Sequence, residues 1–156
     1  MSRIIRQESI YIREKMYSRS IGTVTFFVNV TSFEEIRYFT NLKTITGFKG
    51  NTKMTTITLP EGVTTLGTEC FRTARIRYLV LPSTISTLNH QCLNPVNYCS
   101  YIVFKSINPP SLNVNAFGLT SGCKIYVPDD SVNAYKTATN WTNYAARIRP
   151  MSEFTG

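Results

Sequence analysis

The fold is decided by Met54-Thr-Thr-Ile-Thr-Leu-Pro-Glu-Gly-Val-Thr-Thr-Leu-Gly-Thr-Glu-Cys-Phe71, which is followed by the matching stretch Ile76-Arg-Tyr-Leu-Val-Leu-Pro-Ser-Thr-Ile-Ser-Thr-Leu-Asn-His-Gln-Cys-Leu93. The apolar positions, the proline and the small residue before a bulky one coincide at a shift of 22 residues. A period in this range indicates stacked supersecondary units. Each unit can bury its apolar face only against its neighbours. The chain is therefore predicted to be a short solenoid whose function lies on a repetitive surface.

The period continues beyond these two copies. The third copy contains one extra residue, which the Pro109-Pro110 loop can absorb, and the fourth stops after Pro128. Upstream, Leu42-Lys-Thr-Ile45 resembles the start of a unit but lies only 12 residues before Met54, which predicts a truncated opening repeat. The anchor residues of the four copies are Leu59, Leu81, Phe104 and Val127.

Each unit is predicted to begin with a short strand. Side chains alternate across a strand, so every second residue points into the core. Successive strands would stack as a parallel ladder, because a 22-residue period leaves room for the crossover that parallel pairing needs. The returns between strands are expected to be irregular or short helical segments, with Cys70, Cys92 and Ala116 where a turn passes close to its neighbour. The inward strand residues are Ile57, Leu59, Leu79, Leu81, Ile102, Phe104, Ile125 and Val127.

The outward strand residues are the candidate binding site. Tyrosine combines a rigid apolar body with a polar tip, which makes it common at recognition surfaces. The alternative is that these residues only pack on one another across the sheet. The first predicted row is Thr56, Tyr78, Tyr101 and Lys124, and the second is Thr58, Val80, Val103 and Tyr126.

The repeated pattern Leu-Pro-x-x-Val/Ile-x-x-Leu-x-x-x-Cys-Phe/Leu resembles the BspA-type leucine-rich repeat, in which alanine is usual where Cys70 and Cys92 stand. Residues 31–42 resemble the opening segment of such arrays, and residues 124–148 resemble their terminal cap. The likeness covers residues 31–150. It implies a leucine-rich-repeat solenoid that is β-rich with a helical C-terminal cap. It also implies a non-enzymatic module without a cofactor that recognises a protein or glycan at a cell surface.

The chain divides into residues 1–30 as a strand-rich or attachment segment, 31–53 as a capping helix and truncated repeat, 54–128 as repeats and 129–156 as the C-terminal cap. Residues 1–30 do not fit the period, although Thr23–Val30 is rich in β-branched and aromatic residues and predicts a strand. At the front, Ser32 and Glu35 have the spacing of a capping box, and Thr31 with Glu34 is a second candidate register. A short amphipathic helix with Phe33, Ile36 and Phe39 would follow.

At the back, Asp129 and Asp130 precede Val132, Tyr135 and Ala138 at helical spacing. A second short helix is predicted from Asn140-Trp141 and would carry Tyr144, Ala145 and Ile148. Trp141 is interpreted as the plug of the open core end, and ligand stacking is the alternative.

Composition limits the partners. The net charge of +8 comes from scattered residues without a nucleic-acid-binding motif, so no specific nucleic acid is expected. The densest group, Arg72, Arg75 and Arg77, is interpreted as a solvated rim, although such a surface could also attract acidic polysaccharide or a negatively charged cell envelope. No apolar run reaches the ~18 residues of a membrane span. His90 is the only histidine and no catalytic motif is present.

Two function classes follow. The first is an adhesion module at a cell surface. The second is a virion component, such as a phage tail-fibre or decoration protein that contacts other virion subunits through residues 1–30. No signal-peptide pattern follows the N-terminal arginines, which favours the second class.

The four cysteines allow two interpretations. Cys70 and Cys92 take the small position and are predicted to be buried, unpaired side chains. Cys99 and Cys123 precede successive strands, and strands ~4.8 Å apart are close enough for a disulfide. Free thiols at these two positions are the alternative.

Overall fold

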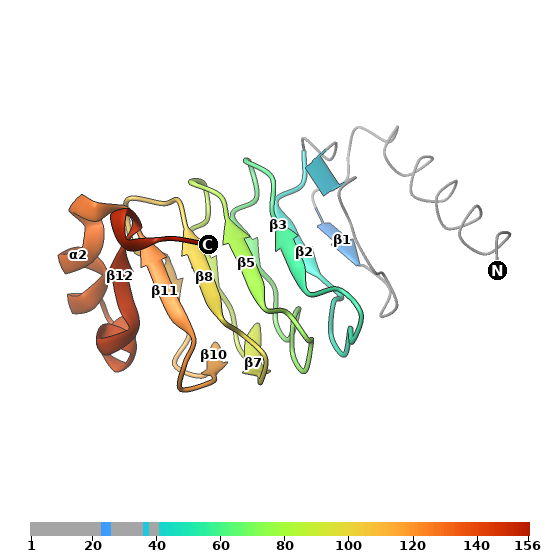
Figure 1. Cartoon of the computed structure of the whole chain (residues 1–156). Coiled ribbons are helices and arrows are strands. Elements are labelled where there is room, and N and C mark those ends of the chain that lie inside the picture. The colour runs from blue at the N-terminus through green and yellow to red at the C-terminus, as the bar shows by residue number, and fades with distance from the viewer. Residues whose placement is uncertain (1–22, 26–35, 38–40) are drawn as a thin grey trace, which may run out of the picture.

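The computed structural model describes residues 23–25, 36–37 and 41–156, which form stacked coils. Three ladders of parallel strands run along the stack (Figure 1). The front sheet contains β3 (Thr56–Thr58), β5 (Tyr78–Leu81), β8 (Tyr101–Phe104), β11 (Lys124–Val127) and β12 (Ile148–Pro150). The return sheet contains β1 (Thr23–Thr25), β2 (Thr44–Thr46), β4 (Thr65–Leu66), β6 (Thr87–Leu88) and β9 (Ser111–Leu112). The third ladder pairs β7 (Leu93–Val96) with β10 (Phe117–Leu119).

The front sheet follows the predicted repeat register. Leu79 pairs with Ile57 on one side and with Ile102 on the other, and Ile102 pairs with Ile125. The eight predicted inward residues are all buried. The leucine-rich-repeat solenoid expected from the sequence is therefore confirmed, and the returns carry short strands as well as turns.

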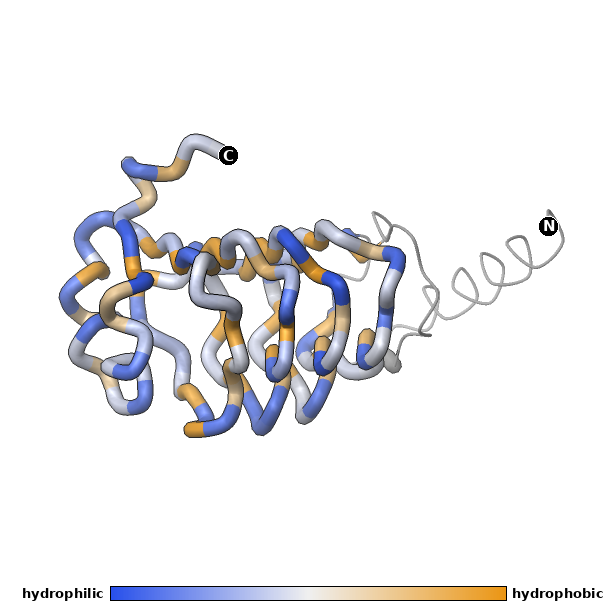
Figure 2. The backbone as a smooth tube through the Cα atoms, turned by 60° about the horizontal axis from the view of Figure 1, so that its bottom comes forward, coloured by the Kyte–Doolittle hydropathy of each residue, from blue (hydrophilic) through white to orange (hydrophobic). Residues whose placement is uncertain are grey.

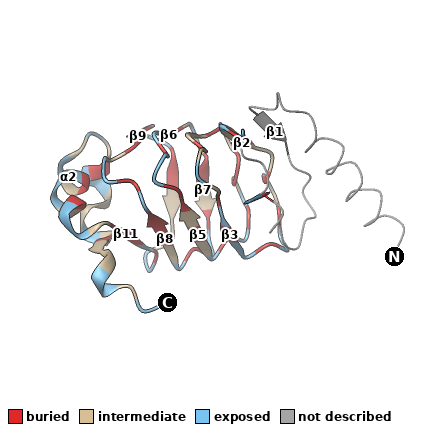
Figure 3. Cartoon of the chain, turned by 90° about the horizontal axis from the view of Figure 1, so that it is seen from above, coloured by how far each residue is buried: buried red, intermediate tan, exposed pale blue. Residues whose placement is uncertain are grey.

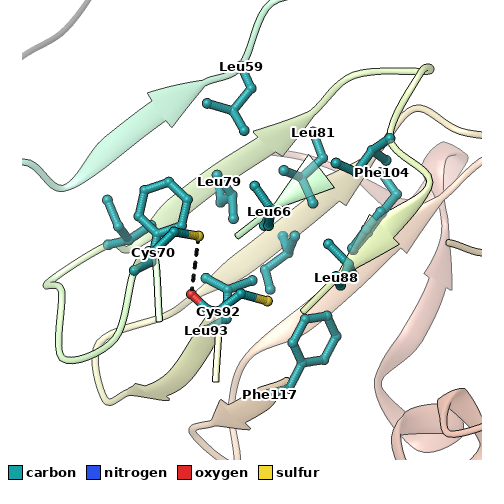
Figure 4. Packing of buried hydrophobic residues seen from close by; sticks show 14 of the residues in the cluster. Leu59, Leu66, Cys70, Leu79, Leu81, Leu88, Cys92, Leu93, Phe104 and Phe117 are labelled. Atoms are coloured by element: carbon teal, nitrogen blue, oxygen red, sulfur yellow. Dashed lines mark hydrogen bonds between the residues drawn. The ribbon is translucent and has the colours of Figure 1, made fainter. Parts of the chain in front are cut away.

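The core fills the space between the front and return sheets. Leu79 and Leu81 are both 0% exposed, because each has a neighbouring coil on both sides. Leu66 and Leu88 meet them from the return sheet (Figure 4). Apolar and polar residues alternate along the coils of the backbone tube in Figure 2. The same local alternation therefore builds one continuous core from successive coils.

The return sheet corrects the interpretation of the opening repeat. Ile45 pairs with Leu66 of the return sheet, so Leu42–Ile45 occupies the second half of a unit and not its start. The ring of Phe48 stacks on that of Phe71 at 5.1 Å, which places Phe48 at the bulky position of its coil. The mistake arose because both halves of a unit offer the same spacing of two apolar residues.

The ladder of the return sheet also reaches further toward the N-terminus than the sequence indicated. Thr23 pairs with Thr44, 21 residues later, and Thr44 pairs with Thr65 at the same interval. The strand expected within Thr23–Val30 is present over Thr23–Thr25, which follow the repeat instead of lying outside it. Ile36 is buried in a single 3-10 turn with Arg37. The capping box at Ser32 and Glu35 lies outside the described residues.

The C-terminal cap closes the core with η2 (Asp129–Ser131), α2 (Val132–Thr137) and η3 (Trp141–Arg147). Trp141 and Tyr135 are both fully buried, and their rings meet edge to face at 4.9 Å. The indole N–H of Trp141 donates to the carbonyl oxygen of Pro110 at 2.8 Å. Trp141 therefore plugs the core, and a ligand-stacking role for it is excluded by its burial. The second predicted helix is a 3-10 helix, and Ile148 lies in β12, where it extends the front sheet beside Ile125.

The four cysteines form one disulfide pair and two free thiols, as predicted. Cys99 and Cys123 form a disulfide between successive coils, with their Cα atoms 5.4 Å apart. Cys70 and Cys92 are free and buried. The thiol of Cys70 lies 3.7 Å from the carbonyl oxygen of Cys92 in the next coil, where only a small side chain fits (Figure 4).

We expect the native protein to be unreactive toward a water-soluble thiol reagent at pH 8. Burial raises the pKa of the Cys92 thiol to about 12 and that of Cys70 well above its ordinary value, so the reactive thiolate is scarce. Denaturation without reductant should release two reactive thiols per chain, and reduction should release the other two. Rapid reaction of the folded protein, or four thiols before reduction, would contradict this assignment.

Candidate functional site

The predicted binding rows lie side by side on the outward face of the front sheet. Tyr101 pairs in register with Tyr78 and with Lys124, which makes the first row continuous. Val103 pairs with Val80 and with Tyr126, which does the same for the second row. Thr56 and Thr58 extend both rows onto β3. The fold thus brings all eight predicted residues onto one face, which we call the tyrosine face.

The tyrosines of this face contact one another. The rings of Tyr78 and Tyr101 stack with centroids 4.6 Å apart, and Tyr101 meets Tyr126 edge to face at 6.3 Å. Such contacts between rings on neighbouring strands stabilise the sheet. Tyr78 and Tyr101 nevertheless remain partly exposed, and Thr56, Thr58 and Lys124 are exposed. The face therefore retains accessible hydroxyl, aromatic and cationic groups.

The C-terminal segment (residues 151–156) lies against part of the tyrosine face. It begins with the 3-10 turn η4 (Met151–Glu153) directly after β12, and the chain then ends beside the front sheet (Figures 1 and 3). The ring of Phe154 meets Tyr101 at 4.8 Å and Tyr126 at 4.9 Å, both in edge-to-face geometry. The carboxylate of Asp129 accepts the backbone N–H of Ser152 at 2.9 Å. This hydrogen bond lowers the pKa of Asp129 and ties the segment to the end of β11.

Two of the eight predicted binding residues are not accessible. Tyr126 is only 6% exposed and Val103 only 5%, so both are buried despite pointing away from the core. Phe154 supplies an apolar contact that the repeat pattern does not contain. The sequence signal for this contact was an aromatic residue beyond the last cap element, and no role was predicted for Phe154.

The three arginines on the turn before β5 differ in their contacts. Arg72 and Lys49 both pair with Glu69, at 2.8 Å and 2.6 Å. The hydrogen bond from Lys49 is the main reason that the pKa of the Glu69 carboxyl is lowered. Arg75 instead lies over the ring of Tyr98, 5.1 Å from its centroid. Part of the predicted solvated rim is therefore neutralised by Glu69, while Arg75 and Arg77 remain exposed.

A second concave feature lies where the strands of the front sheet end. It is a cleft of about 240 Å³ between residues 83–86 and 106–110. Serine, threonine and proline side chains line it together with Ile85, Ile107 and Asn108, and no charged residue takes part. The cleft is concave and presents hydroxyl groups, but it contains no group suited to acid-base chemistry.

Side chains that could bind a metal ion lie apart from one another in the described part of the chain. His90 is exposed on a return loop, as expected. Within that part, no three His, Cys, Asp or Glu side chains are placed to hold a metal ion. The described helices include none that is long and apolar enough to span a membrane. The tyrosine face is the surface on which the fold gathers all eight candidate residues.

Comparison with known proteins agrees with the observed architecture. The family model described as BspA type leucine rich repeat region matches residues 19–143, in six copies. The match begins before β1, which agrees with the position of that strand in the return sheet. No curated protein matches the chain.

Proposed function

Because the chain belongs to the BspA-type leucine-rich repeat family, we propose that it is a non-enzymatic adhesion module that recognises a protein or glycan at a cell surface. Repeat solenoids present extended surfaces on which the same position recurs in each coil, and such surfaces serve as binding sites. The observation that carries the proposal is the stacked pair Tyr78 and Tyr101, which remains partly exposed at the centre of the tyrosine face.

The environment of these tyrosines supports recognition rather than packing alone. A tyrosine whose only role was to stabilise the sheet would contribute more stability if it were fully buried, as Tyr126 is under Phe154. Tyr78 lies instead between the exposed Thr56 and the half-buried Tyr101 on neighbouring strands. Its ring is held by the stack, so little conformational entropy is lost when a partner binds. An ordered, accessible aromatic ring is the usual anchor of a binding hot spot.

Substitution of Tyr78→Ser is expected to weaken binding to a surface partner by about tenfold or more, because it removes an anchor ring. Tyr78 is preferable to Tyr101 as the first target, since Tyr101 also contacts Phe154. The partner would be found by screening the intact chain on glycan and surface-protein arrays, and affinities would be compared by surface plasmon resonance.

The matched control is Val114→Ser, which changes an exposed apolar side chain in the loop after β9. Both variants should unfold within about 5 °C of the unaltered chain, because neither removes a buried side chain. Unchanged binding by Tyr78→Ser, with loss in Val114→Ser, would move the site away from the tyrosine face.

The virion alternative makes a different prediction about assembly. A fibre component would form a stable oligomer such as a trimer, whereas a free-standing adhesion module would be a monomer. Light scattering on the purified chain separates the two, and a stable trimer would favour the virion component.

A further inference from the structure

The uncovered part of the tyrosine face has a distinct chemistry. Phe154 and the C-terminal segment cover the apolar end near Tyr126, while Thr56, Thr58 and Tyr78 stay open. The accessible part therefore offers hydroxyl groups beside an aromatic ring. Hydroxyl groups both donate and accept hydrogen bonds.

A basic ridge borders this open part where the strands of the front sheet begin. We define the ridge as Lys53, Arg75 and Arg77, which are all exposed, together with Tyr98, which is 47% exposed. Backbone hydrogen bonds stack its segments coil on coil. Arg75 N–H donates to the carbonyl oxygen of Asn51, and Ser100 N–H donates to that of Arg77. Positions that are 20 or more residues apart thus lie on adjacent coils of one surface.

Charge is segregated between the two ends of the front sheet. Residues 51–55, 73–77, 97–100 and 120–124, which lead into the strands, contain no aspartate or glutamate. The nearest carboxylate along the chain, Glu69, is already paired with Lys49 and Arg72. Glu61, Asp129 and Asp130 lie at the opposite end, where the strands finish, and Glu153 of the C-terminal segment is paired with Arg149 at 3.9 Å. Among the described residues, no ion pair neutralises Lys53, Arg75 or Arg77, and such a positive field attracts anions.

We propose that the partner of the tyrosine face is an anionic glycan, whose sugar rings lie on Tyr78 and the threonine hydroxyls while its carboxylates or sulfates bind the basic ridge. This inference rests on the proposed function and names the class of its ligand. A pyranose ring presents C–H groups on its face and hydroxyls at its edge, which match the tyrosine ring and the threonine hydroxyls. Arg77 carries the guanidinium nearest in sequence to Tyr78, and a guanidinium binds carboxylate and sulfate oxygens in pairs.

Two other classes of macromolecule fit the surface less well. A protein interface needs a desolvated apolar centre. Here the most apolar part of the face, Val103 and Tyr126, is already buried, and Phe154 of the same chain packs on Tyr126. Single-stranded nucleic acid is held by bases stacked on free aromatic rings. The rings of Tyr78 and Tyr101 already stack on each other, which leaves no space for a base between them.

The test measures binding of the whole chain to four immobilised probes of similar length: hyaluronan and heparin oligosaccharides as anionic glycans, cellulose oligosaccharides as neutral glycan, and single-stranded DNA. We expect an anionic glycan to bind best, with an affinity that falls as salt is raised. The double variant Arg75→Glu, Arg77→Glu should weaken that binding by about tenfold or more, because it places like charges beside the ligand. The control Lys43→Glu, Lys136→Glu makes the same change in net charge on other surfaces and should alter affinity by less than about threefold.

The outcomes separate this inference from the proposed function. If Tyr78→Ser abolishes binding to a protein or neutral glycan while the ridge variant binds normally, the tyrosine face is the site and the anionic-glycan assignment is wrong. If both double variants weaken binding equally, the attraction comes from net charge and the inference fails. Tighter binding to DNA than to either anionic glycan would also overturn it. Loss of anionic-glycan binding in both Tyr78→Ser and the ridge variant, with circular dichroism melts unchanged, would support both conclusions.

Discussion

Removal of residues 129–156 is expected to make the protein aggregate or unfold. The deletion takes away Trp141, Tyr135 and Ile148, which are all fully buried, and it uncovers the edge of β11 that β12 pairs with. Phe104 and Phe117 would lose the edge-to-face contacts that Trp141 makes with them at 5.2 Å and 5.7 Å. An open core end and an unpaired strand edge both promote association. Size-exclusion chromatography and thermal melts of the fragment 1–128 measure the effect.

Deletion of residues 152–156 alone is the matched control. It removes the contacts of Phe154 but leaves α2, η3 and β12 in place. This shorter deletion should stay soluble and unfold cooperatively, with Tyr101 and Tyr126 more exposed. A fragment 1–128 that is soluble and melts cooperatively would show that the cap is not needed to close the solenoid.

The substitution Leu81→Ala is expected to lower the free energy of unfolding by ~2–5 kcal/mol. Leu81 is 0% exposed and lies between two coils, with β3 on one side and Phe104 of β8 in register on the other. Truncation removes buried methyl groups and leaves a cavity that the neighbouring coils cannot close without breaking their ladder. Urea unfolding followed by circular dichroism measures the loss.

The adjacent outward residue provides the control for Leu81. Val80 is half-buried on the tyrosine face, so Val80→Ala removes less buried surface and should cost clearly less. A loss below about half a kcal/mol for Leu81→Ala would be too small for a core residue and would mean that the repeat register is wrong.

The repeat itself could be predicted closely from the sequence. Whether a strand residue points inward depends only on its position in the strand, and the 22-residue period aligns those positions between coils. Ile57, Leu79, Ile102 and Ile125 are therefore inward and in register, as predicted. Cys99 and Cys123 meet for the same reason, since equivalent places in neighbouring coils are one strand spacing apart.

The wrong predictions concern segments whose place within the repeat unit is not determined by the period alone. Leu42–Ile45 was placed in the wrong half of its unit, because pairs of apolar residues with similar spacing occur in both sheets. Thr23–Thr25 was left outside the repeat, although Val24 and Phe27 have the same spacing in the sequence as Ile45 and Phe48. Only the pairing of β1 with β2 identified it as another strand of the return sheet.

The sequence by itself determined the solenoid, its inward residues and the membership of the outward rows, because these follow from alternation along a strand and repetition between coils. The tertiary structure alone decided which outward residues remain exposed. Burial of Tyr126 depends on Phe154, which lies 28 residues further along the chain and folds back over the sheet after the repeats have ended. It likewise decided that the basic ridge exists, because Lys53 comes next to Arg75 and Arg77 only when the coils stack and their backbones are hydrogen-bonded across the ladder.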